Sequence, residues 1–169
     1  ILLNTYNAEN EMSIAMAGQI ADLFAASYPQ AHQYPERDRD IKEREDAESI
    51  CRQCRDGKTY FVATDNQQNV MGFLESSVVV MEDRCVVMMN WLMVDEAYRG
   101  QKVSTALHKQ FIAYAKSLAE KSALPVYLGL NVNRENPAMT VYEKWGYEKG
   151  PEVSGGKVFM YRAIGDEEA

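Results

Sequence analysis

Residues 90–116, NWLMVDEAYRGQKVSTALHKQFIAYAK, constrain the fold more than any other stretch of the chain. An apolar run at 86–94 predicts a buried strand, and the polar residues at 98–104 predict a loop after it. A helix is predicted next, because apolar residues recur at helical spacing: Val103, Ala106, Leu107, Phe111, Tyr114, Ala115 and Leu118. The first N–H groups of such a helix lack helical partners and lie at the positive end of its dipole, so this point favours a bound phosphate.

Further strands and helices are predicted on both sides of this stretch. Strands are expected at 1–6, 59–64, 70–81, 85–94, 125–132, 147–149 and 157–164. Asn10 is a candidate cap for a first helix that ends before Pro29. The charged residues 36–48 are expected on a second helix that ends at Gly57. The short connections between the strands from 59 to 94 indicate an antiparallel meander, whereas the helix before the strand at 125–132 indicates a parallel, right-handed crossover.

A last short helix is predicted near the C-terminus. Asn136 is expected to cap it, Pro137 suits its first position, and Gly146 is expected to end it. The resulting order is β-α-α-β-β-β-α-β-α-β-β. At 169 residues, the chain is expected to form one domain, residues 1–169, around a single core.

Charge and hydropathy narrow the classes of partner. The net charge of -7 argues against nucleic acid, because neutralising phosphates needs a basic face. The same charge is compatible with a cationic amine substrate. No apolar run reaches the roughly 18 residues of a membrane span, and the first residues lack the basic-then-apolar pattern of a signal peptide. We therefore expect a cytoplasmic protein without a membrane partner.

The three cysteines, Cys51, Cys54 and Cys85, form no even disulfide framework, which suits a reducing compartment. Cys51 and Cys54 make one C-x-x-C pair. A metal or redox role would need a second ligand pair or a thioredoxin-like context, and the sequence has neither. We interpret both residues as small apolar side chains on a helix and expect no metal site.

Two motifs together resemble the GNAT acetyltransferase family. Residues 99–104, RGQKVS, resemble its acyl-coenzyme A pyrophosphate loop, with the pattern Gln/Arg-x-x-Gly-x-Gly/Ala, and residues 92–98 resemble the usual lead-in. Residues 136–147 resemble its later signature, N-x-x-A followed by Y-E-K-x-G-F. Lys102 and Ser104 stand where the family usually has Gly and Gly or Ala. A glycine matters where the backbone approaches a ligand closely or takes positive φ.

The resemblance implies the GNAT acyl-coenzyme A acetyltransferase fold, of class α/β (α+β): a mixed, mostly antiparallel seven-stranded sheet flanked by about four helices. In that fold the central strand and the next one splay apart, and the pantetheine arm lies between them. By resemblance, the arm borders Leu92, Met93 and Val94, its amides pair with the backbone of Leu92 and Val94, and Asn136 contacts it. The diphosphate is expected to contact Arg99, Gly100, Gln101, Lys102, Val103 and Ser104.

Acetyl transfer to an amine also needs an acid for the departing thiolate and a route for the amine's proton. By resemblance, Tyr142 is the acid, since a phenol with a pKa of about 10 suits a thiolate of similar basicity. The alternative is that Tyr142 belongs only to the apolar stripe of its short helix. Two loop tyrosines and one histidine could line the acceptor pocket, although no role is favoured for any one of them: Tyr28, His32 and Tyr34.

The base is less clearly indicated. Many family members place a glutamate at the position of Asn90, which cannot accept a proton at neutral pH but could hold a water. Glu75, on the preceding strand, is the nearest-looking carboxylate, and a solvent-facing charge is its favoured interpretation. A water relay to backbone carbonyls stays open. His108 is expected to face solvent.

The sequence therefore predicts a cytoplasmic, acetyl-coenzyme A-dependent N-acetyltransferase. It would act on a primary amine of a small molecule or peptide by direct attack within a ternary complex. The alternatives are a catalytically inactive GNAT-like domain that binds coenzyme A as a sensor or interaction module, and an enzyme that transfers another acyl group. A phosphate-loop nucleotide enzyme is disfavoured, because the Gly-x4-Gly-Lys-Ser/Thr pattern is absent. The resemblance leaves a homodimer open.

Overall fold

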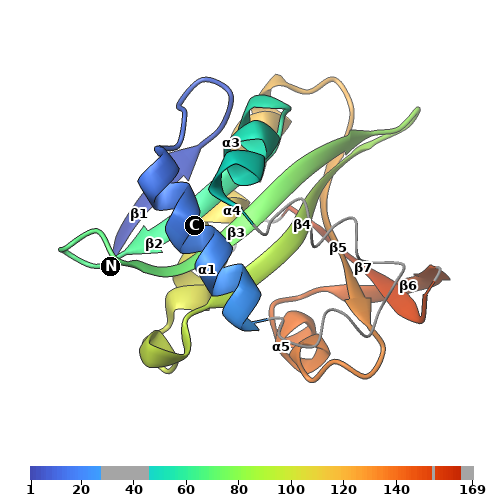
Figure 1. Cartoon of the computed structure of the whole chain (residues 1–169). Helices are drawn as coiled ribbons and strands as arrows, with labels where there is room; N and C mark the ends of the chain where they lie inside the picture. Colours follow the sequence, from blue (N-terminus) through green and yellow to red (C-terminus); the bar gives the residue numbers. More distant parts are fainter. Residues whose placement is uncertain (28–45, 154, 165–169) are drawn as a thin grey trace. The chain divides into compact units, whose positions relative to one another are not determined.

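The computed structural model describes residues 1–27, 46–153 and 155–164, and their order of elements is the predicted one (Figure 1). The predictions for Tyr28, His32, Tyr34 and most of residues 36–48 concern positions outside the described residues. The elements are β1 Leu2–Tyr6, α1 Ile14–Ser27, α3 Ala47–Arg55, β2 Thr59–Thr64, β3 Val70–Val80, β4 Cys85–Val94, the 3₁₀ helix η3 Glu96–Tyr98, α4 Val103–Lys121, β5 Val126–Asn133, α5 Ala138–Lys144, β6 Glu148–Val153 and β7 Lys157–Ala163.

The strands form one seven-stranded sheet in the order β1-β2-β3-β4-β5-β7-β6. Strands β1 and β2 are antiparallel, as are β5 with β7 and β6 with β7, whereas β4 and β5 are parallel. The parallel pair is the crossover that the intervening helix predicts. The mixed, mostly antiparallel sheet and the four α-helices of the described residues confirm the predicted fold class.

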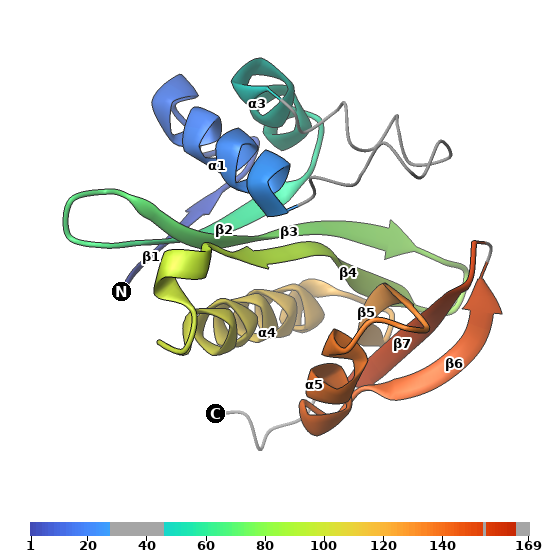
Figure 2. The same cartoon turned by 60° about the horizontal axis from the view of Figure 1, so that its bottom comes forward.

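The chain divides into two compact units. Unit 1 comprises Ile1–Glu75 and Trp91–Gln110, and unit 2 comprises Ser76–Asn90 and Phe111–Ala169. In unit 1, α1 and α3 lie on one side of β2, and the start of α4 lies on the other (Figure 2). The core between α1, α3 and the strands is apolar and includes Ile20, Phe24, Ile50, Tyr60 and Phe73. In unit 2, β5 pairs with β4 on one side and β7 on the other.

The caps of α1 and α3 show why these helices begin where they do. Ser13 Oγ accepts a hydrogen bond from Met16 N at 3.1 Å, so Ser13 rather than Asn10 caps α1. Asn10 instead donates to the carbonyl of Thr5 at 2.7 Å, which corrects the prediction. Asp46 caps α3 by accepting from Ser49 N at 2.8 Å, and this hydrogen bond lowers the pKa of Asp46.

The cysteines of α3 belong to the packing of unit 1. Cys54 is buried in the apolar core, and burial raises the pKa of its thiol to about 12. Cys51 packs against the same core and donates to the carbonyl of Met12 at a sulfur–oxygen distance of 3.6 Å. A thiol with so high a pKa is a poor nucleophile at neutral pH. This confirms the interpretation of the pair as apolar helix residues.

Gly72 on β3 lets three segments of unit 1 meet closely. A Cβ at this position would lie 2.7 Å from the carbonyl oxygen of Met93, 3.1 Å from Val103 Cγ1 and 3.3 Å from Val94 Cα. The absence of a side chain therefore allows the end of β4 and the start of α4 to pack against β3. These are the two segments in which the sequence places the donor-binding residues.

Candidate active site

The turn after β4 is anchored at both of its ends within unit 1. The backbone N–H of Asp95 donates to the carbonyl of Met71 on β3 at 2.8 Å, and its side chain accepts from Ala97 N at 2.9 Å to cap η3. At the other end of η3, the hydroxyl of Tyr98 donates to Asp65 Oδ2 at 3.2 Å. The loop that follows therefore leaves the sheet from a fixed point.

The backbone direction at Asp95 also fixes where the neighbouring groups of β4 point. In a strand, the N–H and C=O groups of successive residues point to opposite sides. Because Asp95 N–H and the Met93 carbonyl both lie toward β3, the backbone groups of Leu92 and Val94 point away from β3. The pairing of β4 with β5 runs from Cys85–Val126 to Met88–Gly129, so Leu92 and Val94 lie beyond it along β4.

Helix α4 begins without a side-chain cap from the residue before it. The carbonyl of Lys102 accepts the first helical hydrogen bond, from Ala106 N at 3.1 Å, which places Lys102 at the cap position. Capping needs a side-chain acceptor, and a lysine ammonium has only donors. The first-turn N–H groups of Val103, Ser104 and Thr105 therefore receive no side-chain acceptor from residue 102.

The loop before α4 passes twice through the left-handed region. Gly100 has a φ of 81° and Lys102 a φ of 62°. Lys102 stands where the family pattern has glycine, and its backbone adopts the conformation that glycine would suit. A side chain in this region costs about 1–2 kcal/mol, so Lys102 carries local strain. Its side chain is exposed.

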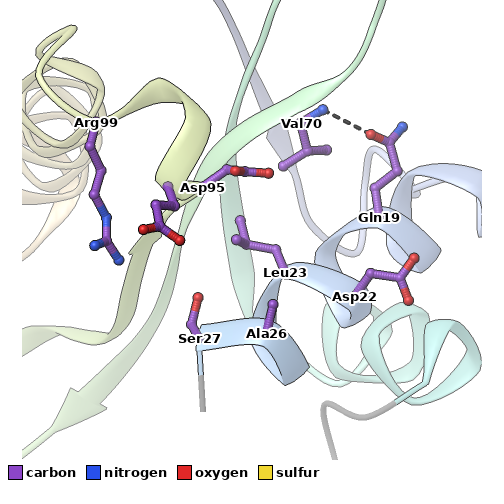
Figure 3. Close-up of a pocket in the computed structure, with 9 residues that line it drawn as sticks. Gln19, Asp22, Leu23, Ala26, Ser27, Val70, Asp95 and Arg99 are labelled. Atoms are coloured by element: carbon purple, nitrogen blue, oxygen red, sulfur yellow. Dashed lines mark hydrogen bonds between the residues drawn. The ribbon is translucent and has the colours of Figure 1, made fainter. Parts of the chain in front are cut away.

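A cavity of about 450 Å³ adjoins this loop in unit 1. Figure 3 shows residues of α1 on one wall and Asp95 and Arg99 on the other. The lining residues are Gln19, Asp22, Leu23, Ala26, Ser27, Val70, Asp95, Glu96 and Arg99. Gln19 joins α1 to β3 at this cavity, since its Oε1 accepts from Val70 N at 2.8 Å. Three carboxylates against one guanidinium make the cavity unfavourable for phosphate, so a diphosphate fits the amides of α4 better.

The α1 residues of this cavity did not stand out in the sequence. Gln19 and Asp22 are polar and one helical turn apart, which places them on one face. The sequence predicts α1 only through its apolar stripe, and a polar pair at this spacing is also what a solvated face would give. The spacing of Gln19 and Asp22 is the available sequence signal, and the cavity that both residues line distinguishes them from a solvated face.

Tyr142 lies on α5 in unit 2, half-buried among aromatic side chains. Its ring centroid is 5.8 Å from that of Trp145 and 6.2 Å from that of Tyr147. Burial raises the pKa of the phenol, so the hydroxyl stays protonated throughout the neutral range. Such a group can donate a proton or hydrogen bond at neutral pH but cannot serve as a base.

Glu75 and His108 are both buried, against expectation. Glu75 is 0% exposed, and its Oε2 accepts a hydrogen bond from the hydroxyl of Tyr60 at 2.5 Å. His108 is 4% exposed. The predicted solvent-facing positions are therefore wrong for both residues. Glu75 lies in the core of unit 1 with its side chain hydrogen-bonded, as a buried polar group requires.

Asn90 and Asn136 both make local hydrogen bonds in unit 2. The amide nitrogen of Asn90 donates to Ser77 Oγ on β3 at 3.0 Å, and Asn90 is half-buried. Asn136 Oδ1 accepts from Ala138 N at 2.9 Å in the turn that leads into α5. The helix begins at Ala138 with Pro137 at the cap position and no side-chain cap, so the predicted cap at Asn136 and start at Pro137 are each one residue too early. Among residues 1–27, 46–153 and 155–164, there is no cluster of three or more side chains suited to a metal ion.

The acetyltransferase (GNAT) domain model matches residues 56–149, which is more than half of the chain. The chain therefore belongs to the GNAT acetyltransferase family, whose members use acetyl-coenzyme A as cosubstrate. This confirms the resemblance carried by the two motifs. No curated protein matches the sequence. None of the described helices is long and apolar enough to cross a membrane.

Three solved structures show the same fold. The PaiA N-acetyltransferase of Thermoplasma acidophilum, in complex with coenzyme A, is 14% identical, with a TM-score of 0.66 over 96% of this chain and 99% of that one. A GNAT-family acetyltransferase of Staphylococcus aureus Mu50 is 17% identical, with a TM-score of 0.68 over 97% and 100%. An aminoglycoside 6'-N-acetyltransferase complexed with coenzyme A is 16% identical, with a TM-score of 0.67 over 97% of each chain.

The strain at Lys102 is testable with two variants that both remove its charge. The free energy of unfolding of Lys102→Gly should be about 1 kcal/mol higher than that of Lys102→Ala, because only alanine places a Cβ in the left-handed region. Chemical denaturation of both variants measures the difference. Equal stabilities would show that residue 102 does not hold a left-handed backbone.

Proposed function

We propose that this protein transfers the acetyl group of acetyl-coenzyme A to a primary amine by direct attack within a ternary complex. The observation that carries the proposal is the backbone conformation at the start of α4. There, the loop passes through two left-handed residues, Gly100 and Lys102, and Lys102 takes the cap position without a side-chain acceptor. Helix N-termini of this kind bind diphosphates through their backbone amides.

The donor would be held by two groups of residues in unit 1. We assign the diphosphate to the first-turn amides of α4, from Val103 to Thr105, with positive charge added by Arg99 and Lys102. The amides of the pantetheine arm would pair with Leu92 and Val94, whose backbone groups point away from β3. The Met93 backbone lies toward β3, which supports only a side-chain role for that residue.

Asn136 remains a proposed contact to the pantetheine arm on the strength of the family signature. Its Oδ1 is engaged by Ala138 N, which fixes the side chain at the start of α5. The amide nitrogen is then the atom that we propose as a donor to a carbonyl of the arm.

The chemistry needs one bond to form and one to break. The amine nitrogen attacks the thioester carbonyl, the new C–N bond forms, and the C–S bond breaks to release the coenzyme A thiolate. We propose that Tyr142 gives its proton to that sulfur. The phenol carries its proton at neutral pH, and burial, by raising its pKa, makes it a weaker acid than a free tyrosine. The tyrosinate is then reprotonated from solvent.

The proton of the incoming amine would leave through water. A primary amine with a pKa of about 10.4 is neutral in only about one molecule in 2,500 at pH 7, a cost of about 4.6 kcal/mol. Asn90 is no base, but its half-buried amide can orient a water. Glu75 is the second candidate; its burial with Tyr60 supports a structural role.

The charge of the chain supports a cationic acceptor. The net charge is -7, and the cavity beside Arg99 carries the carboxylates of Asp22, Asp95 and Glu96. Such a field raises the local concentration of positively charged amines. We therefore place small molecules with at least one ammonium group first among the acceptors.

A second function is favoured by one observation. Asn90 occupies the strand position where many family members have a glutamate, which suits a domain that binds coenzyme A without catalysis. Donor binding alone does not separate this sensor from the enzyme, whereas release of free thiol does.

Acetyl-coenzyme A should stabilise the fold measurably. At about 100 times its dissociation constant, the expected gain is about 2.7 kcal/mol, seen as a rise in melting temperature. Acetyl-pantetheine, which lacks the diphosphate, is the matched control and should stabilise less at equal concentration. Thiol release should then appear with a cationic amine. The absence of any thermal shift would contradict both the enzyme and the sensor, and a shift without turnover on a broad amine panel would favour the sensor.

Tyr142→Phe should lower kcat by about 100-fold while leaving the dissociation constant of acetyl-coenzyme A unchanged, because it removes a general acid and not a binding contact. Because burial raises the phenol pKa above its ordinary value of about 10, the wild-type activity controlled by Tyr142 should persist past pH 10 and fall only at higher pH. A pH–kcat profile of both proteins measures this. An unchanged kcat in Tyr142→Phe would show that Tyr142 serves only in packing.

A further inference from the structure

Helix α5 ends in a motif that fixes the backbone of Tyr142. The N–H of Tyr147 donates to the carbonyl of Tyr142 at 3.0 Å, and the N–H of Gly146 donates to the carbonyl of Glu143 at 3.0 Å. These are the two hydrogen bonds of a Schellman motif, which needs a left-handed residue, and Gly146 has a φ of 91°. The contact between the Tyr142 and Tyr147 rings is the apolar contact that accompanies this motif.

Arg162 on β7 lies against this turn. A Cβ on Gly146 would be 3.5 Å from Arg162 Nε, 3.6 Å from Cδ and 4.0 Å from Cζ. The guanidinium and the end of its stem therefore pack directly over the glycine. Any larger residue at 146 would meet Arg162 as well as the unfavourable φ.

The position of Arg162 is one at which an apolar residue is expected. Along β7, Val158, Met160 and Arg162 share one face of the strand, and all three are buried, with Arg162 7% exposed. Burying a guanidinium is costly unless its donors are used. An arginine in this row therefore calls for a reason beyond filling the core.

We propose that Arg162 is a positioning residue for the reaction: it holds the Gly146 turn, and through that turn it sets the place of the Tyr142 hydroxyl. The inference rests on the proposed role of Tyr142 as the acid. Arg162 touches neither substrate in this account. Its effect should fall on the chemical step, because small displacements of a catalytic group cost rate rather than binding.

A double-mutant cycle tests the proposal. Arg162→Met keeps much of the side-chain volume but removes the guanidinium, and it is measured in wild-type and Tyr142→Phe backgrounds. In the wild-type background, kcat should fall about tenfold with the KM for acetyl-coenzyme A unchanged. In the Tyr142→Phe background, the same substitution should change kcat by less than about twofold, because the group that it positions is gone.

Two further variants keep the test decisive. Arg84→Met removes an exposed arginine of the same unit and should leave kcat unchanged in both backgrounds. Arg162→Lys keeps the charge and should lose less kcat than Arg162→Met. If Arg162→Met does not fold, Arg162→Lys replaces it in the cycle. Its loss of kcat should then appear in the wild-type background and not in the Tyr142→Phe background.

The outcomes separate the two proposals. Equal loss of kcat in both backgrounds, or no loss in either, overturns the positioning role while leaving Tyr142 as the acid. If Tyr142→Phe alone keeps full kcat, the acid role fails, and the inference for Arg162 fails with it.

Discussion

The structure depends on a general constraint: backbone N–H and C=O groups must find partners, and where the chain does not supply them a ligand can. In the proposed donor site, groups of this kind lie at the start of α4 and the end of β4 in unit 1. Lys102 cannot cap the helix, and Leu92 and Val94 direct their backbone groups away from β3. A diphosphate joined to an amide-bearing arm carries the complementary groups. The family assignment and the local geometry therefore lead to the same donor.

The acidic chain binds an anionic donor only if local groups outweigh the overall charge. The net charge is -7, and the cavity beside Arg99 is itself rich in carboxylates. In the proposed donor site, short-range hydrogen bonds from the amides of α4, with Arg99 and Lys102 beside them, would act on the diphosphate directly, whereas distant charges are screened within about 8 Å at physiological salt. The strain at Lys102 fits this view, because functional loops often retain unfavourable backbone conformations.

Local signals predicted much of the fold. The bounds of β2 and β4 coincide with the predicted strands, because runs of β-formers are bounded there by turn residues. The end of α5 follows from Gly146. The cap of α1 was missed because Asn10 and Ser13 are both good capping residues, and only the fold shows which one meets the helix.

The site was predicted less completely, since burial depends on residues that are distant in the chain. Glu75 is enclosed with Tyr60 of the neighbouring β2, and no local pattern reports that contact. His108 is buried because α4 covers more than a narrow stripe: Leu107, His108, Phe111 and Ile112 are all buried. The conformation of Lys102 and the place of Arg162 over Gly146 likewise follow from three-dimensional structure alone.

The most direct test of the central claim is to follow backbone amide signals by nuclear magnetic resonance during titration with coenzyme A and, separately, with pantetheine. The amides of Val103, Ser104 and Thr105 should shift strongly with coenzyme A and little with pantetheine, because only coenzyme A carries the diphosphate. The amides of Leu92 and Val94 should shift with both. Binding of coenzyme A that leaves the first turn of α4 unperturbed would contradict the account.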